Sequence, residues 1–271
     1  MFYQRSIKNR ITCKGIGLHS GKHIQLSLIP SPTNTGIIFY RVDANKKLEI
    51  PALYENVVNT QLATTIGING VTISTIEHLM AAITGLGIDN LRVEVDGPEL
   101  PVMDGSALPF AYLLRNAEII QQSKFKKFFF VKKPVSFIEN DKESHLLPSQ
   151  QFKVSCTIDF NHPLILNQSY TFDFSDTAFI REIARARTFG FMKDVEAMKR
   201  RGLALGGSLE NAVVIDEYNV LNSDGLRYPD EFVRHKILDA IGDLALLGMP
   251  VIAHYSGIKS GHALNYQLVK K

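Results

Sequence analysis

The sequence predicts an α+β protein made of two similar halves, and three observations lead to this prediction. The length of 271 residues fits one large or two medium domains, at roughly 150 residues each. Strand-rich segments are followed by helices in the first half, and the second half repeats that order. In both "EHLMAAITGLGIDNLRV" and "RHKILDAIGDLALLGMPVIAH", a His-bearing apolar helix ends at glycine and leads into a strand. We therefore predict domains at 1–123 and 124–271.

The first half alternates strand and helix signals. β-type residues on either side of the turn "PSPTN" predict two strands, and "ISTIEHLMAAITGLG" then shows helical periodicity up to a glycine. "NLRVEVD" alternates apolar and polar residues, which indicates a strand with one buried face. A Gly/Pro loop and a second helix follow, and the polar segment "RNAEIIQQSK" ends this half. In chain order we expect strands at 23–30 and 35–42, a helix at 73–87, a strand at 90–96 and a helix at about 107–117.

The second half is expected to use the same kinds of element. Its most informative segment is "RHKILDAIGDLALLG", whose apolar residues leave little room for a solvated face and predict a buried helix. In chain order we expect strands around 126–138 and 151–160, helices within 176–200, the buried helix at 234–248 and a closing pair of strands.

Composition narrows the class of protein. The net charge of +3 is too small to indicate nucleic-acid binding, and no apolar run approaches the ~18 residues of a membrane span. The N-terminus lacks the apolar run of a secretory signal, and Cys13 and Cys156 lack metal-type spacing. We expect a cytoplasmic monomer. "KFKKFFFVKK" at 124–133 fits either a strand with solvated ends or a phosphate- or membrane-facing patch, so weak association with a membrane surface stays open.

The helix at 234–248 has polar residues on one buried stripe. His235, Asp239 and Asp243 are spaced i, i+4 and i+8, one above another. A buried unpaired carboxylate costs several kcal/mol, so these groups require partners. His235 and Asp239 could ligate one metal ion. They could equally form a structural hydrogen bond, and a metal site requires a third ligand.

"STIEHLMAA" offers that third ligand. His78 lies on another predicted apolar helix, with Glu77 beside it. Ser74 and Glu77 match the capping box S-x-x-E, which would make Glu77 a helix starter. A glutamate beside a histidine ligand is also the arrangement of zinc hydrolases, in which it acts as the base. The spacing does not choose between these two roles.

Two further segments raise the odds of catalysis. "SGHALN" places His262 after a glycine turn, at the start of what we expect to be a short alternating strand on the rim. "ARARTFGF" places Thr188, expected to be exposed, among arginines and aromatic residues. Each also fits an ordinary loop residue.

The segment 189–200 has apolar residues at helical spacing. Phe191, Val195 and Met198 recur at i, i+4 and i+7, which predicts one face of a short helix. The face could pack into the core. The following "RGLALGGS" contains glycines that would allow another chain or a ligand to approach closely.

Eight motifs together resemble one enzyme family. They are "TIEHLMAA", "GIDN", "PVMDGSA", "DFNHP", "ARTFGF", "GLALGGS", "GLRYPDEFVRHKILDAIGDLALLG" and "SGHALN". The chain resembles the bacterial UDP-3-O-acyl-N-acetylglucosamine deacetylases, the zinc amidases of lipid A biosynthesis. The resemblance runs in order from about Ile11 to the C-terminus.

The resemblance implies a role for each candidate residue. The family's zinc ligands fall on His78, His235 and Asp239, and three protein ligands leave a fourth position for water. The family's base falls on Glu77, and its second acid–base residue falls on His262, which Asp243 would orient. Thr188 matches the oxyanion donor, and Lys236 matches a lysine that contacts substrate. Positions around the nucleoside diphosphate fall on Phe160, Phe191 and Lys259, and further substrate contacts are expected at Phe189, Gly207 and Ser208.

The resemblance also implies an architecture. Helices would pack on β-sheet in each of two domains, with the active site in the cleft between them and small inserts at roughly 41–70 and 189–208. The second insert would form a passage for the substrate's acyl chain. Ala63 stands where many members have cysteine.

Two other functions share the same ligand set. Two histidines and one carboxylate also describe non-haem Fe(II) oxygenases, and Fe²⁺ could replace Zn²⁺ in the deacetylase site itself. A lipid or nucleotide binder stabilised by a structural metal is the third hypothesis. Only a hydrolase needs a base, an acid and an oxyanion donor around the metal.

Overall fold

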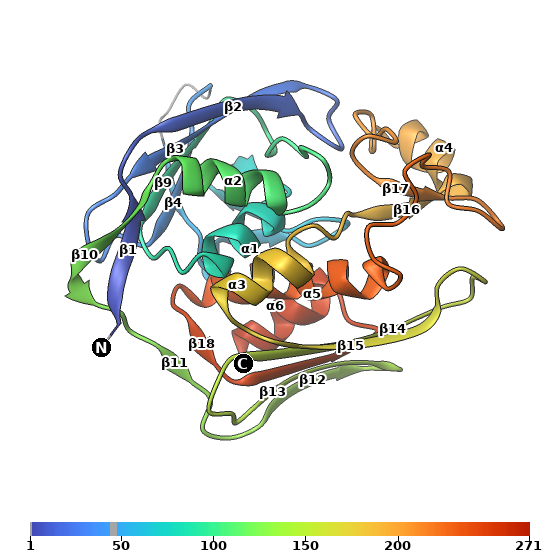
Figure 1. Cartoon of the computed structure of the whole chain (residues 1–271). Coiled ribbons are helices and arrows are strands. Elements are labelled where there is room, and N and C mark those ends of the chain that lie inside the picture. The colour runs from blue at the N-terminus through green and yellow to red at the C-terminus, as the bar shows by residue number, and fades with distance from the viewer. Residues whose placement is uncertain (1, 44–47) are drawn as a thin grey trace.

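Two five-stranded sheets with the same connectivity frame the molecule (Figure 1). The structure is a computed structural model that describes residues 2–43 and 48–271. The first sheet has the order β2 (Ile11–Ile16), β3 (His23–Pro30), β9 (Leu91–Val95), β4 (Ile37–Arg41), β5 (Glu49–Pro51). The second has the order β12 (Val135–Glu139), β13 (Lys142–Leu147), β19 (His254–Ile258), β14 (Lys153–Phe160), β15 (Leu166–Asp173).

The two sheets match strand by strand. In each sheet, the strand that comes last in the sequence, β9 or β19, lies at the centre. This central strand pairs antiparallel with one hairpin (β2–β3 or β12–β13) and parallel with the first strand of the other (β4–β5 or β14–β15). The predicted α+β class with two similar halves is therefore confirmed. The predicted boundary between residues 123 and 124 falls inside a strand, β10 (Ile119–Phe125), and remains a prediction.

Helices fill the space between the two sheets (Figure 1). α1 (Glu77–Gly85) and α2 (Leu108–Asn116) lie towards the first sheet, and α5 (Glu231–Leu244) and α6 (His262–Lys270) towards the second. α1 packs directly on α5. All residues of α1 except Thr84 are buried, because helices of the other layer cover the side that a surface helix would expose to water.

The glycine stops expected after the two His-bearing helices are confirmed. The segment after α1 turns at Gly87, with φ of +63°, and the short helix η3 (Ala245–Leu247) after α5 ends at Gly248, with φ of +77°. Such positive φ values favour glycine. Each turn returns the chain towards the central strand of its sheet.

Small sheets and short helices complete the fold. Three strands form a small sheet, β6 (Val57–Asn59), β7 (Thr65–Ile68) and β8 (Val71–Ile73). β6 and β7 lie in the range expected for the first insert, of which residues 44–47 fall outside the described residues, and β8 follows that range. Three further strand pairs are β1 (Tyr3–Ile7) with β10, β11 (Phe129–Phe130) with β18 (Val251–Ile252), and β16 (Phe189–Phe191) with β17 (Val213–Ile215). The remaining short helices are η1 (Tyr54–Asn56), α3 (Asp176–Ala178), η2 (Phe179–Ile183) and α4 (Met192–Arg200).

Several predicted elements were wrong. The polar segment expected to end the first half forms β10, whose pairing with β1 supplies its backbone hydrogen bonds. The strand expected around 126–138 is two strands, β11 and β12. Of the closing pair of strands, the strand before His262 is present as β19, but the strand expected to begin at His262 is the helix α6. Leu264, Leu268 and Val269 of α6 are buried at helical spacing. Across residues 2–43 and 48–271, every helix falls short of the length and hydrophobicity that crossing a bilayer requires.

Candidate metal centre

A glycine sets the close approach of α1 and α5. An ideal Cβ placed on Gly242 of α5 would lie 2.1 Å from the carbonyl oxygen of Glu77 in α1. A side chain at this position would therefore force the two helices apart. The contact brings the N-terminal turn of α1 onto the C-terminal half of α5, beside the predicted polar stripe.

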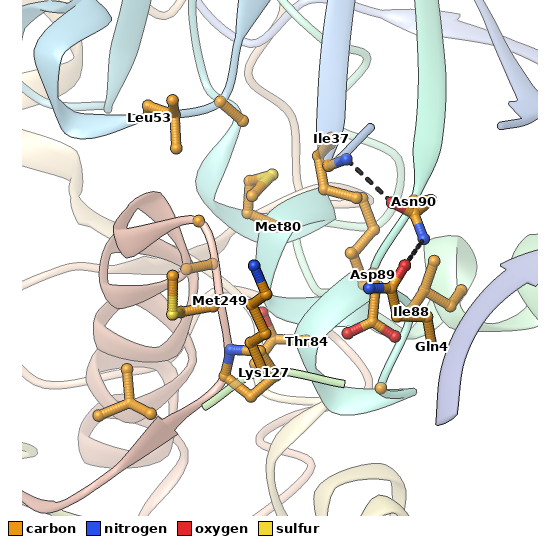
Figure 2. A pocket seen from close by; sticks show the side chains of 18 of the residues that line it. Gln4, Ile37, Leu53, Met80, Thr84, Ile88, Asp89, Asn90, Lys127 and Met249 are labelled. Atoms are coloured by element: carbon orange, nitrogen blue, oxygen red, sulfur yellow. Dashed lines mark hydrogen bonds between the residues drawn. The ribbon is translucent and has the colours of Figure 1, made fainter. Parts of the chain in front are cut away.

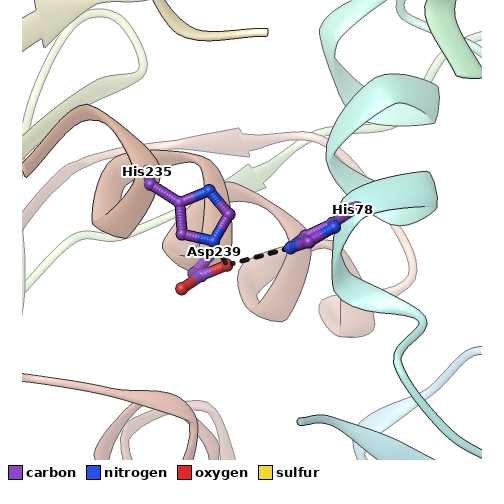
Figure 3. A group of neighbouring side chains, drawn as sticks. All are labelled: His78, His235 and Asp239. Atoms are coloured by element: carbon purple, nitrogen blue, oxygen red, sulfur yellow. Dashed lines mark ion pairs between the residues drawn. The ribbon is translucent and has the colours of Figure 1, made fainter. Parts of the chain in front are cut away.

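Three buried side chains meet at this crossing (Figure 3). His78 comes from α1, and His235 and Asp239 come from successive turns of α5. The Nε2 atoms of His78 and His235 lie 3.7 Å and 3.3 Å from Asp239 Oδ1, and the imidazole rings are nearly perpendicular, at 84°. Their candidate ligand atoms all lie within 4.8 Å of one another. The structure thus brings together the three residues that the sequence singled out.

Hydrogen bonding shows that this trio fits a cation. Nδ1 of His235 lies 3.0 Å from the Ala186 carbonyl, to which it donates, so Nε2 presents a lone pair. That lone pair faces Asp239 Oδ1, which is buried and accepts no hydrogen bond from any described residue. A lone pair facing an unsatisfied carboxylate oxygen is unfavourable unless a positive charge lies between them. Two imidazole nitrogens and a carboxylate oxygen are ligands typical of a divalent transition metal such as zinc.

The ionisation of the trio suits the same purpose. Burial lowers the pKa of His235 to about 3, so its imidazole is neutral at physiological pH. Although burial opposes ionisation of Asp239, its neighbours, of which Lys236 is charged at neutral pH, hold the pKa of its carboxyl well below its usual range. Lys236 Nζ binds the second oxygen, Oδ2, at 2.6 Å and leaves Oδ1 to the histidines. Metal ligands must be deprotonated, as His235 and Asp239 are.

A buried ion pair fixes the loop that orients His235. Arg187, next to Ala186, donates from its guanidinium and its backbone N–H to Glu231, at 2.9 Å in each case. Glu231 is the first residue of α5 and is fully buried. The "ARARTFGF" segment is thereby tied to the helix that holds His235, and Arg187 itself is buried. Thr188 is half-buried rather than exposed.

Glu77 is not a helix cap. The residue before α1, Ile76, makes no side-chain capping bond, and the Ser74 hydroxyl pairs instead with Thr65 at 2.8 Å. The Glu77 carboxylate is 3% exposed and accepts a hydrogen bond from the Thr64 backbone N–H at 3.0 Å through Oε2. Burial raises the pKa of this carboxyl above its ordinary value. The capping-box interpretation was therefore wrong.

His262 is the first residue of a helix, not of a strand. Its Nδ1 lies 2.8 Å from Asp243 Oδ2, and its Nε2 lies 3.8 Å from Glu77 Oε1. Burial disfavours a charged imidazole, but Asp243, with smaller contributions from Glu77 and Asp239, raises the pKa of His262 to about 10. At neutral pH this is a protonated histidine aimed at a carboxylate.

Two partners of this pair were missed by the sequence interpretation. The Thr64 hydroxyl donates to Asp243 Oδ1 at 2.6 Å, so Thr64 binds both Glu77 and Asp243. The Asn265 side-chain amide donates to Asp243 Oδ2 at 2.8 Å. Asn265 lies one turn after His262 on α6, and correct assignment of that helix would have revealed it. Thr64 lies in an irregular loop beside Ala63, where no periodicity signals a contact.

The predicted aromatic contacts form one cluster beside His235. The ring of Phe160 lies 5.7 Å from that of Phe189 and 5.9 Å from that of Phe191, and Phe189 lies 6.4 Å from the His235 ring. Lys236 Nζ lies 5.7 Å from the centre of the Phe189 ring. This cluster gives the trio an apolar wall on the side of the second sheet.

Lys259 directly follows β19 and lies near the end of β14 that carries Phe160, without belonging to the aromatic cluster. Its Nζ pairs with Asp159 at 2.8 Å and with Asp141 at 3.0 Å. Asp159 precedes Phe160 in β14, so Lys259 and the aromatic cluster flank the same strand end. No direct contact joins Lys259 to the trio among the interactions of the described residues.

The predicted helical face in 189–200 was partly wrong. Phe191 ends the strand β16, and α4 begins only at Met192. Val195 and Met198 do lie on α4, but the helix has no buried residue, so the face does not pack into the core. Burial would require a neighbouring layer, and α4 projects from the side of the molecule beside β16 and β17 (Figure 1).

The glycine segment after α4 contacts the first half of the chain. Backbone N–H groups of Leu205 and Gly206 donate to the carbonyls of His19 and Leu18. Gly207 lies next to this contact, where an added Cβ would meet the Ala204 carbonyl at 3.3 Å. The Ser208 backbone N–H donates to Asn211 at 2.9 Å. The two residues are therefore placed where segments of both halves meet.

A cavity of about 340 Å³ lies elsewhere along the same helix pair (Figure 2). Met80 and Thr84 of α1 line it together with Ile241 and Leu244 of α5, and Lys127 reaches into its mouth. His78, His235 and Asp239 do not line it. The trio therefore belongs to a different part of the interface between the two halves.

The chain matches a protein family over nearly its whole length. Residues 4–271 match the family described as "LpxC: UDP-3-O-acyl N-acetylglycosamine deacetylase". The UDP-3-O-acyl-N-acetylglucosamine deacetylase of Myxococcus xanthus (strain DK1622) is 56% identical over 270 residues, which cover 100% of this chain and 86% of that protein. Proteins of the same name from Anaeromyxobacter sp. (strain Fw109-5) and Acidithiobacillus ferrooxidans (strain ATCC 53993 / BNL-5-31) are each 53% identical, cover 99% and 100% of this chain, and are themselves covered to 88% and 90%.

Proposed function

Because the chain belongs to the UDP-3-O-acyl N-acetylglycosamine deacetylase family, we propose that it hydrolyses the acetamide of UDP-3-O-[(3R)-3-hydroxyacyl]-N-acetylglucosamine. The products would be acetate and the free amine, in a step of lipid A biosynthesis. The observation that carries the proposal is the buried His78, His235 and Asp239 trio with an unsatisfied carboxylate oxygen at its centre. The substrate itself is proposed from the names of the relatives.

Zinc is the proposed metal, held by the trio. Three protein ligands leave a further position open, as in catalytic rather than structural zinc sites. Zinc would supply Lewis acidity, which makes a water molecule more acidic and polarises the amide carbonyl. Fe²⁺ has the same ligand preferences and is the alternative occupant.

Glu77 is the proposed general base. Thr64 holds one of its oxygens, so the carboxylate keeps a fixed orientation with Oε1 free. The raised pKa of the buried carboxyl improves its ability to take a proton at neutral pH, because a catalytic base works best when its pKa lies near the working pH. Its position next to the His78 ligand places it beside the metal centre.

His262 is the proposed general acid. The Asp243 carboxylate orients the ring through Nδ1 and favours its charged form, so Nε2 presents a proton towards the site. Donation of that proton to the departing nitrogen would release a neutral amine. Asp243 is thus a positioning residue, itself fixed by Thr64 and Asn265.

The remaining residues are proposed to bind substrate. Thr188 would hydrogen-bond the developing oxyanion, and Lys236, beside Asp239, would contact the reacting part of the sugar. Contacts around the nucleoside diphosphate and the acyl chain are proposed at Phe160, Phe189, Phe191, Lys259, Gly207 and Ser208. The open apolar face of α4 supports an acyl passage there, since Val195 and Met198 are half-exposed.

The rival functions have less support. An Fe(II) oxygenase or a metal-stabilised binder would need no base and acid, yet Glu77 and His262 lie 3.8 Å apart beside the trio. A cytoplasmic location and a monomeric state remain proposals from the sequence.

The test separates the base from a ligand. Glu77→Gln should keep its bound zinc and lose ~10²–10⁴-fold in acetate release, the usual contribution of general base catalysis. His78→Ala should lose the metal itself. Metal content per chain and acetate release from the sugar nucleotide are measured for both, with chelation and zinc add-back for the unmodified protein. If Glu77→Gln proved as empty of metal as His78→Ala, the assigned roles would be wrong.

A further inference from the structure

β1, β10 and the start of β11 lie at the edge of the molecule, away from α1 and α5 (Figure 1). These strands and the residues beside them carry a group of exposed aromatic and basic side chains. The sequence had left its segment, "KFKKFFFVKK", open between a strand and a surface patch. We call this group the aromatic–basic patch, and it consists of Phe2, Phe125, Phe128, Phe130, Lys124, Lys127, Lys132 and Lys133.

Three rings of the patch are in contact with one another, and Phe125 forms a separate pair with Tyr3. The ring of Phe128 lies 5.8 Å from that of Phe2 and 6.4 Å from that of Phe130, and Phe125 packs on Tyr3 at 4.9 Å. Phe2 and Phe130 are nevertheless 71% and 60% exposed. Phenylalanines that stay this exposed bury only a minor part of their surface on folding, so folding alone does not account for them.

The basic part of the patch is uncompensated. All four lysines are exposed, and none lies within ion-pair distance of a carboxylate in residues 2–43 and 48–271. Lys126 in the same segment differs, because its side chain is largely buried and its Nζ pairs with Asp89 at 3.0 Å. Lys126 is therefore not counted in the patch. The patch therefore combines exposed apolar rings with four free positive charges.

We propose that this patch docks the protein on an anionic membrane surface. Phenylalanine rings enter the boundary between lipid headgroups and acyl chains, and lysines beside them are attracted by negatively charged lipids. Both properties are needed together, since the rings alone would fit a neutral bilayer and the lysines alone would fit any polyanion. The charge complementarity of four unpaired lysines selects the anionic bilayer as the partner.

The ring geometry disfavours single-stranded nucleic acid. Bases stack on aromatic faces that are presented outwards as platforms. Here the Phe2 and Phe128 rings meet edge to face, at 74°, and Phe128 and Phe130 are tilted by 58°, so the rings pack against one another. The segment also has no arginine, the side chain that forms forked contacts with phosphate.

The experiment measures partition of the full chain onto vesicles. Vesicles of equal parts phosphatidylcholine and phosphatidylglycerol are compared with pure phosphatidylcholine in a sedimentation assay, at low and high salt. The charge variant is the double substitution Lys124→Glu with Lys127→Glu, and the ring variant is Phe2→Ser with Phe130→Ser. The matched control is Lys14→Glu with Lys22→Glu, two exposed lysines at β2 and the turn after it, which gives the same change of net charge elsewhere.

The protein should bind the anionic vesicles and lose binding as salt rises. At about fivefold per lysine, the charge variant should lose at least ~25-fold in partition, and the control should change little. The ring variant should weaken binding but keep its salt dependence. Thermal unfolding checks that each variant is folded.

Four results would overturn the proposal. The first is absence of binding to anionic vesicles by the unmodified protein. The second is equal loss in the charge variant and the control, which would assign binding to net charge. The third is a ring variant with unchanged vesicle binding but an altered oligomeric state by light scattering, which would assign the patch to a second copy of the chain. The fourth is a patch that binds a thymidine oligonucleotide and not vesicles, which would assign it to nucleic acid.

Discussion

The closest contact between α1 and α5 makes Gly242 the sharpest test of how the fold builds the metal centre. In Gly242→Ala, the new methyl group would lie 2.1 Å from the Glu77 carbonyl oxygen, whereas a Cβ essentially never approaches another heavy atom within 3.0 Å. The helices must separate by about 0.9 Å at this point, the difference between these distances. The helix of His78 and Glu77 would then shift relative to that of His235 and Asp239.

The expected effect on activity is larger than the effect on stability. Overpacking costs ~1–3 kcal/mol, and replacing a helical glycine by alanine offsets roughly 0.5–1 kcal/mol of it. A displacement near 1 Å between catalytic groups can cost ~10²-fold in rate. Gly242→Ala should therefore stay folded, bind zinc more weakly and lose about two orders of magnitude in kcat/KM.

Metal content per chain, acetate release at saturating zinc and thermal unfolding are measured together. The control is Gly190→Ala, at a glycine where an added Cβ meets no atom within 4 Å, and its metal content and unfolding temperature should match those of the unmodified protein. Full activity and full metal affinity in Gly242→Ala would refute the reasoning, because the helix crossing would then not set the ligand geometry.

Three further outcomes follow from the site and its support. Asp243 raises the pKa of His262, and the proposed acid must be protonated, so kcat/KM should fall as pH rises through the His262 pKa. Asp243→Asn lowers that pKa and should move the alkaline limb of the pH profile to lower pH. An unmoved limb would exclude Asp243 from the mechanism. Gly207→Phe should impair acylated substrate far more than a deacylated analogue, and equal loss on both would place the acyl site elsewhere. Arg187→Ala leaves Glu231 buried without its partner and should lower the free energy of unfolding by ~3–5 kcal/mol in denaturant titrations; a change below 1 kcal/mol, roughly a surface effect, would contradict the pairing.

The ligands could be predicted from sequence because their signal is local. His235 and Asp239 are one helical turn apart, so helical periodicity alone places them on one stripe. His78 was found because it is a polar residue in an otherwise apolar helix. The crossing of α1 and α5 then brings His78 to His235 and Asp239. Asp243 was found by the same spacing, although its partner His262 was placed on the wrong kind of element.

The errors have physical causes. "HALNYQLVK" fits alternation at Leu264, Tyr266 and Leu268 and helical spacing at Leu264 and Leu268, and only packing against α5 and the second sheet decides between them. β10 is polar because it pairs at the molecular surface, so its strand character lies in backbone hydrogen bonds that side chains do not reveal. Thr64 depends on tertiary contacts alone, since its partners lie 13 and 179 residues away.

The two sheets with matching connectivity mark two repeated units, and both units supply ligands to the candidate metal centre. A bound ion would therefore have a second physical role. The ligands are divided unequally between the repeated units, one on α1 and two on α5, so neither unit can bind the ion tightly alone. By thermodynamic linkage, an ion that binds only the docked arrangement stabilises that arrangement by its own binding free energy. A bound ion would thus act as a reversible, non-covalent cross-link between the two repeats, and tighter metal binding would mean firmer docking of one repeat on the other.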